Sequence, residues 1–197
     1  MFKKSALFIS GLILFAALTR LLPHAYNFTA IGAVALFGAA WLPKKGWALA
    51  VPLAVPLLAL FLSDLILNNL VYASFYDGFQ LMTPGFLSIY GAFVLIVLLA
   101  IPLFRKVTFP RVLTGALGAS VVFFLVSNFG VWISSPLYPL TAEGLILCYT
   151  AAIPFFHYTV AGNLVYSAVL FGGFAYLTSH RPDLVPAMIA AHPTDND

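Results

Sequence analysis

The sequence predicts an all-α integral membrane protein, built as a bundle of six transmembrane helices. Hydrophobic residues make up 62% of its 197 residues, charged residues make up only 8%, and the mean hydropathy is +1.03. This polar surface is too small to solvate a globule of that size in water, so the expected solvent is lipid. The apolar runs are continuous and do not alternate with a period of two, which favours helices over a transmembrane barrel.

The first three predicted spans cover residues 5–22, 28–42 and 47–67. Pro23 ends the first span, because a proline inside a helix removes a backbone hydrogen bond and clashes with the preceding turn. The second span is short and rich in Gly and Ala, which let helix backbones approach closely in lipid. We therefore expect it to pack on several sides. A long, aromatic and polar outer loop follows the third span, over residues 68–84.

The remaining spans are predicted at residues 85–104, 112–133 and 159–177. Residues 140–156 are apolar enough to form a seventh span, but that count would leave Arg181 outside the cell. We therefore predict that this segment is a re-entrant or interfacial helix in the last outer loop. Residues 1–180 are expected to form one transmembrane domain, and residues 181–197 a flexible tail.

Basic residues lie between the apolar runs in a pattern that predicts the orientation. Loops rich in Lys and Arg stay in the cytoplasm. With six spans, both termini are expected on the cytoplasmic side of the inner membrane, which also accounts for the net charge of +3 without nucleic-acid binding. The basic patches are Lys3 with Lys4, Lys44 with Lys45, Arg105 with Lys106 and Arg111, and Arg181; Arg20 is the exception.

In this topology the polar side chains gather in the outer half of the bundle and in the outer loops. A cavity open to the outside and lined by amides, aromatic rings and a few charges is suited to capture a sizeable neutral or mixed-polarity solute. The candidate ligand-binding residues are His24, Asn27, Asp64, Asn68, Tyr72, Tyr76, Asp77, Gln80, Tyr90, Asn128, Trp132, Tyr138 and His157.

Asp64 needs a partner or access to water, because an unpaired carboxylate at the bilayer centre costs about 2.5–3.5 kcal/mol on insertion scales. Arg20 and His24 are the natural partners, since both lie at the same depth. The pair is equally compatible with pinning two helices together and with touching a ligand. Asn27 has a second interpretation as the N-cap of the next helix.

Other polar residues also have structural interpretations. Asn128 in the fifth span is typical of an interhelical hydrogen bond. Trp132 and Tyr138 are typical of the aromatic belt at a membrane interface. Cys148, the single cysteine, suits a small packed position. No permanently bound cofactor and no protein-built metal site is expected, because the His and Asp residues are too scattered in sequence.

Ala6 and Ser10 lie four residues apart on one face of the first span, where small residues provide a docking groove for another helix. Packing within the chain is an equal alternative. The sequence lacks the nucleophile elbow, the zinc-protease helix motif and the phosphate-binding loop. We therefore do not expect an enzyme, and an ATPase that drives transport would have to be another chain.

This layout resembles the substrate-binding S-component of energy-coupling factor vitamin transporters. The resemblance rests on six short-looped spans, on the Ala6 and Ser10 face at the position of that family's Ala-x-x-x-Ala motif, and on Ser63 with Asp64 at the end of the third span. It implies uptake of a vitamin, together with a transmembrane coupling subunit and two ATPases. Ala6 and Ser10 would dock that partner.

Within this set, the size and general layout of the chain are similar to those of the solitary cobalamin transporters. This similarity implies cobalamin as the transported ligand. That group has a cobalt-coordinating cysteine in the third loop, and residues 68–84 contain none. His24 or Asp64 is then the candidate contact to the ligand's cobalt. Two other functional classes stay open: a membrane-embedded enzyme that uses His24, Asp64 or His157 as acid or base, and an assembly subunit without solute affinity.

Overall fold

The computed structural model describes residues 2–22, 27–42 and 49–180, which are helical apart from the connections between helices. These residues form six helical rods. The rods are α1 (Phe2–Leu21), α2 (Ile31–Trp41), α3 (Ala50–Ile66) with a π-helical turn at Leu67–Val71, α4 (Phe86–Leu103), α5 (Phe109–Ser134), and α6 (Ala142–Ser167) continued by a π-helical turn at Ala168–Gly172 into α7 (Gly173–His180).

Four of these rods are long and apolar enough to cross a membrane. They span 22 residues from Ala50, 18 from Phe86, 26 from Phe109 and 39 from Ala142. A helix needs roughly 20 apolar residues for that crossing. The outward faces of α4 and α5 carry exposed leucines that suit contact with lipid, namely Leu95, Leu98, Leu99, Leu117 and Leu125. The predicted all-α class is confirmed for the described residues, and the four long apolar rods are compatible with the predicted membrane location.

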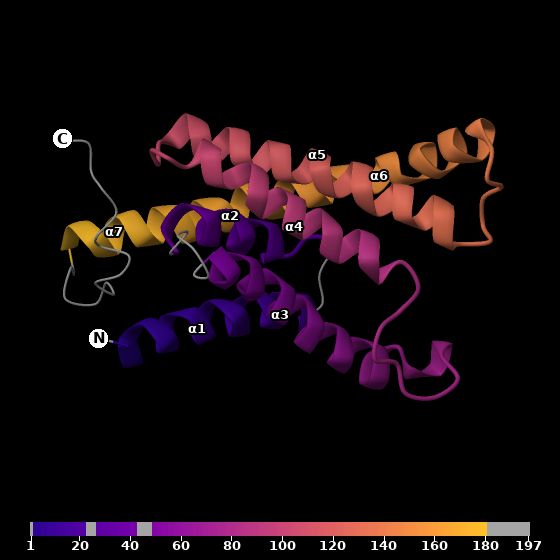
Figure 1. Cartoon of the computed structure of the whole chain (residues 1–197), viewed down its shortest axis with the longest axis horizontal. Coiled ribbons are helices and arrows are strands. Elements are labelled where there is room, and N and C mark those ends of the chain that lie inside the picture. The colour runs from indigo at the N-terminus through magenta and orange to yellow at the C-terminus, as the bar shows by residue number, and fades with distance from the viewer. Residues whose placement is uncertain (1, 23–26, 43–48, 181–197) are drawn as a thin grey trace.

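Successive rods run antiparallel, so the two ends of the bundle differ (Figure 1). The start of α1, the connection between α4 and α5, and the end of α7 lie at one end, which we call the terminal end. The connections that follow α3 and α5 lie at the opposite end, which we call the loop end. The loop end carries a short 3-10 helix, Ala73–Phe75.

The short helix α2 is the centre of the bundle. Residues 31–40 are all buried, and α2 packs on α1, α3, α4, α5 and α6. Its small side chains allow this close packing; Gly38, for example, lies against the backbone of Pro52 on α3. The prediction that this helix is packed on several sides is confirmed.

One expectation about the last third of the chain was wrong. We expected residues 140–156 to form a helix separate from the span at 159–177, and the structure has one continuous rod over Ala142–His180. The rod begins at an N-cap, where the Thr141 hydroxyl accepts from the Gly144 N–H at 3.2 Å. Pro154 lies inside α6 without ending it.

This continuity also excludes the seven-span alternative, in which residues 140–156 would be an antiparallel neighbour of the last span. A 39-residue helix is roughly 58 Å long, far longer than a hydrocarbon core of about 30 Å. In a membrane, a rod of this length would have to tilt or extend beyond the hydrocarbon. The start of α6 lies at the loop end (Figure 1).

Candidate functional site

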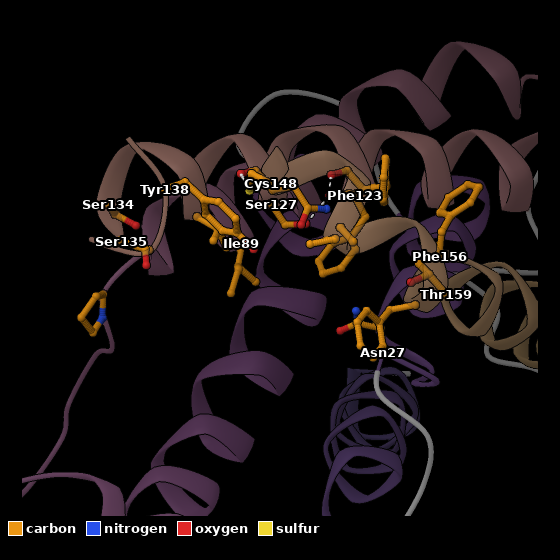
Figure 2. A pocket seen from close by; sticks show the side chains of 18 of the residues that line it. Asn27, Ile89, Phe123, Ser127, Ser134, Ser135, Tyr138, Cys148, Phe156 and Thr159 are labelled. Carbon is orange, nitrogen blue, oxygen red and sulfur yellow. Dashed lines mark hydrogen bonds between the residues drawn. The ribbon is translucent and has the colours of Figure 1, made fainter. Parts of the chain in front are cut away.

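Two adjoining cavities lie among the described residues of the bundle. The first, cavity 1, has a volume of about 840 Å³ and lies between α4, α5 and α6. Figure 2 shows it with Ser134, Ser135 and Tyr138 at one end and Asn27 and Thr159 at the other. Its lining consists of Asn27, Pro84, Gly85, Ile89, Phe123, Phe124, Ser127, Asn128, Val131, Ser134, Ser135, Pro136, Tyr138, Cys148, Ala151, Ala152, Phe155, Phe156 and Thr159.

The second cavity, cavity 2, has a volume of about 440 Å³ and reaches deeper into the bundle. It shares Asn27, Ile89, Phe123 and Thr159 with cavity 1, so the two spaces adjoin. The remaining lining of cavity 2 consists of Arg20, Thr29, Ile31, Gly32, Leu60, Leu67, Tyr72, Phe93, Ile96 and Asn163.

The cavities exist because α2 is short. Its 11 residues extend roughly 16 Å, about half of a hydrocarbon core. Ile31 and Gly32, the first residues of α2, line cavity 2 and therefore mark where this helix begins to fill the bundle. Toward the loop end from that point, α4, α5 and α6 surround space that α2 does not occupy.

The floor of cavity 2 is a hydrogen-bonded polar contact between α5 and α6. The Asn163 Nδ2 donates to the Ser120 Oγ at 2.9 Å, and that hydroxyl donates to the Ala116 carbonyl at 2.8 Å. Gly32 of α2 lies against the Asn163 side chain, and a Cβ at position 32 would overlap it. Only glycine therefore fits between α2 and this amide.

An ion pair borders cavity 2 and connects three helices. The Arg20 Nη1 on α1 lies 2.6 Å from the Asp64 Oδ1 on α3, and it also donates to the Ser63 Oγ at 2.6 Å. The Tyr90 hydroxyl on α4 donates to the Asp64 Oδ2 at 3.3 Å. The prediction that Arg20 partners Asp64 is confirmed. Both charges are partly buried, with about a fifth of each side chain exposed.

Four of the predicted ligand-binding residues line the cavities. Asn27 lines both, Tyr72 lines cavity 2, and Asn128 and Tyr138 line cavity 1. Asn27 does not cap α2, contrary to its alternative interpretation. The N-cap is Ala30, whose backbone N–H donates to the Thr19 hydroxyl of α1 at 3.1 Å.

Asn27 occupies the left-handed backbone region with a φ of 62°, which Asn tolerates better than most residues. This conformation is incompatible with the usual N-cap geometry. Asn27 therefore contributes a polar side chain to the junction of the two cavities instead of ending a helix.

The other predicted site residues lie elsewhere. Asp64 and Tyr90 belong to the ion-pair network, and Asn68 is buried in the π-helical turn after α3. The Trp132 indole donates to the Pro139 carbonyl at 2.9 Å, and His157 is exposed beside the Tyr158 ring. Tyr76, Asp77 and Gln80 lie in the connection after α3 and are not part of either lining.

The structure does not describe the side chains at three of the predicted positions. His24 lies outside the described residues. Ala6 and Ser10 lie on α1, whose side chains are described only from Gly11 onward.

Asp64, the other candidate for a contact to cobalt, already binds Arg20 and Tyr90. Within residues 2–22, 27–42 and 49–180, no group of three or more His, Cys, Asp or Glu side chains could hold a metal ion.

Several cavity residues were missed by the sequence analysis. Ser127 and Ser134 are seven residues apart, as are Ser120 and Ser127, so the three serines follow one face of α5. That spacing was the signal that could have identified the polar wall. The rings of Phe123, Phe124, Phe155 and Phe156 gave no such signal, because Phe is common throughout this sequence. Cys148 was expected to be packed and is buried, yet it also borders cavity 1.

Comparison with known proteins identifies a family but no function. Residues 1–186 match the family model described as "Family of unknown function (DUF6580)". No curated protein and no solved structure matches the chain.

Proposed function

This chain belongs to the DUF6580 family, and we propose that it is a membrane-embedded substrate-binding subunit that captures a vitamin for uptake into the cell. The observation that carries the proposal is the pair of adjoining cavities at the loop end of the bundle. Ligand sites are concave, largely apolar spaces of about 300–1,000 Å³ with a few polar groups, and cavity 1 has this size and composition.

The charges support an outward-facing cavity. Arg105, Lys106 and Arg111 lie at the connection between α4 and α5, which is at the terminal end. Under the positive-inside rule, this end faces the cytoplasm. The loop end then faces outward from an inner membrane, the chain crosses six times although α2 itself covers only half of the hydrocarbon core, and both termini are cytoplasmic.

The entrance to cavity 1 lies at the loop end. Pro84, Ser134 and Pro136 belong to its lining, are exposed, and come from the ends of the connections that follow α3 and α5. A solute that arrives from outside would therefore meet these residues first. It would then pass inward along α5 toward Thr159 and Asn27, at the junction with cavity 2.

Cobalamin is the first candidate because of the resemblance stated above. A molecule of its size would have to occupy both cavities, whereas a smaller vitamin would fit within cavity 1 alone. The S-component resemblance implies a coupling subunit and two ATPases from other chains, whereas a solitary transporter works without them. Docking of that partner on Ala6 and Ser10 stays a prediction.

Equilibrium binding by the purified protein tests this function. The protein in detergent would be titrated calorimetrically with cyanocobalamin, riboflavin, thiamine and biotin. We expect at least one of them to bind with a submicromolar Kd, and a bound cobalamin would co-elute with its visible absorbance on gel filtration. If no vitamin in the panel binds, the proposed function is wrong.

A further inference from the structure

The two serines with which α5 lines cavity 1 donate their hydroxyl hydrogens to their own helix. The Ser127 Oγ donates to the Phe123 carbonyl at 2.6 Å, and the Ser134 Oγ donates to the Gly130 carbonyl at 2.7 Å. A serine hydroxyl has one hydrogen and two lone pairs. Both oxygens can therefore only accept hydrogen bonds from a molecule in the cavity.

The neighbouring polar groups reinforce this acceptor character. The Asn128 Nδ2 donates one of its two N–H groups to the Phe124 carbonyl at 2.7 Å, and the Oδ1 is an acceptor with two lone pairs. The Cys148 thiol donates to the Asn128 carbonyl at 3.4 Å, so its hydrogen is also used. From Ser127 to Ser134, the wall of α5 thus offers three acceptor oxygens, with the second N–H of Asn128 as its one donor.

The rest of the described lining of cavity 1 consists of aromatic, aliphatic, amide, hydroxyl and thiol side chains. A charged ligand placed among them would lose its hydration without meeting an opposite charge. In cavity 2 the Arg20 guanidinium is already paired with Asp64 at 2.6 Å. The described residues therefore provide uncharged polar groups, and no net charge for a charged ligand to neutralise.

We propose that cavity 1 selects an uncharged, ring-containing solute that directs N–H or O–H donors toward Ser127, Asn128 and Ser134. Its apolar body would pack on Phe123 and Phe156, which lie on the cavity wall (Figure 2). This inference rests on the proposed function and narrows its substrate class. Carboxamides, imides and hydroxyl groups are the donor groups that fit this wall, whereas carboxylates and quaternary ammonium groups do not.

A charge-matched panel tests the substrate class. Cyanocobalamin and riboflavin are uncharged and rich in N–H or O–H donors, thiamine is a cation, and biotin is an anion at pH 7. We expect an uncharged member to bind roughly 100-fold or more tightly than either ion, because the ions lose hydration without compensation. Tightest binding of thiamine or biotin would overturn the class while leaving vitamin capture intact. Failure of all four would overturn both proposals.

The acceptor wall is tested separately by Ser127→Ala. Loss of one hydrogen bond between uncharged groups should weaken binding of the tightest uncharged vitamin by about three- to tenfold. Ser127→Thr keeps an acceptor oxygen and should restore most of the affinity. Thr150→Val is the matched control, because the Thr150 hydroxyl makes the same bond to the carbonyl four residues back, at 2.7 Å, on an exposed position of α6. Equal affinity in Ser127→Ala and Thr150→Val would overturn the role of this wall.

Discussion

Replacing Asp64 with Asn is expected to destabilise the folded bundle by about 3 kcal/mol. The Asp64 carboxylate lies 2.6 Å from the Arg20 Nη1 and also accepts from the Tyr90 hydroxyl. Its loss leaves a partly buried guanidinium without a counter-charge. Removing one partner of such a pair destabilises a fold more than replacing both partners. For a chain of this length, the apparent Tm should fall by roughly 6–12 °C, measured by thermal unfolding in detergent.

Asp77→Asn is the matched control for this variant, because Asp77 is exposed in the connection after α3 and belongs to neither cavity lining and to no described ion pair. We expect its Tm to equal that of the parent. Removing the cation as well, in Arg20→Met with Asp64→Asn, should recover part of the loss, since no unpaired charge then remains. An unchanged Tm in Asp64→Asn would show that the ion pair does not hold α1 to α3.

Replacing Ala152 with Trp is expected to abolish vitamin binding. Ala152 lies on α6 and lines cavity 1, and an indole at this position would occupy space that the solute needs. We expect affinity to fall by roughly 100-fold or more, because overlap with a bulky side chain excludes the bound pose entirely. Calorimetric titration with the vitamin that binds the parent most tightly measures the effect.

The control for the added bulk is Ala175→Trp. Ala175 is exposed on α7 near the terminal end, far along the same rod from cavity 1. The Ala175→Trp protein should bind the vitamin with the affinity of the parent protein. Thermal unfolding of both variants separates blocked binding from misfolding. Parent-like affinity in a folded Ala152→Trp protein would place the solute somewhere other than cavity 1.

Much of the fold follows from local features of the sequence. The Gly- and Ala-rich run predicts a helix packed on several sides, because only small side chains allow such close approach, and α2 is that helix. The Arg20–Asp64 pair could also be predicted, since an isolated charge is costly in lipid. The rod at Ala142–His180 was not predicted, because the rule on basic loops was used to separate residues 140–156 from the last span, and that rule carries no information on whether a helix is continuous.

The candidate site was predictable only in part. Asn27, Tyr72, Asn128 and Tyr138 were found because polar and aromatic residues stand out in an apolar sequence. The position of the cavity depends on the end of α2, and therefore on three-dimensional packing. The hydrogen bond by which the Ser127 hydroxyl donates to its own helix, and so is left to accept, could not be predicted from the sequence either. A serine in a membrane helix is equally compatible with helix packing.

Accessibility of the cavity entrance from outside the cell tests the central claim most directly. The protein would carry Ser134→Cys in a Cys148→Ala background, which leaves one thiol at the exposed rim of cavity 1. Intact cells would be treated with a membrane-impermeant maleimide, with and without saturating cyanocobalamin. An outward-facing vitamin site predicts rapid labelling that cyanocobalamin slows. Labelling that occurs only after the membrane is permeabilised would contradict it.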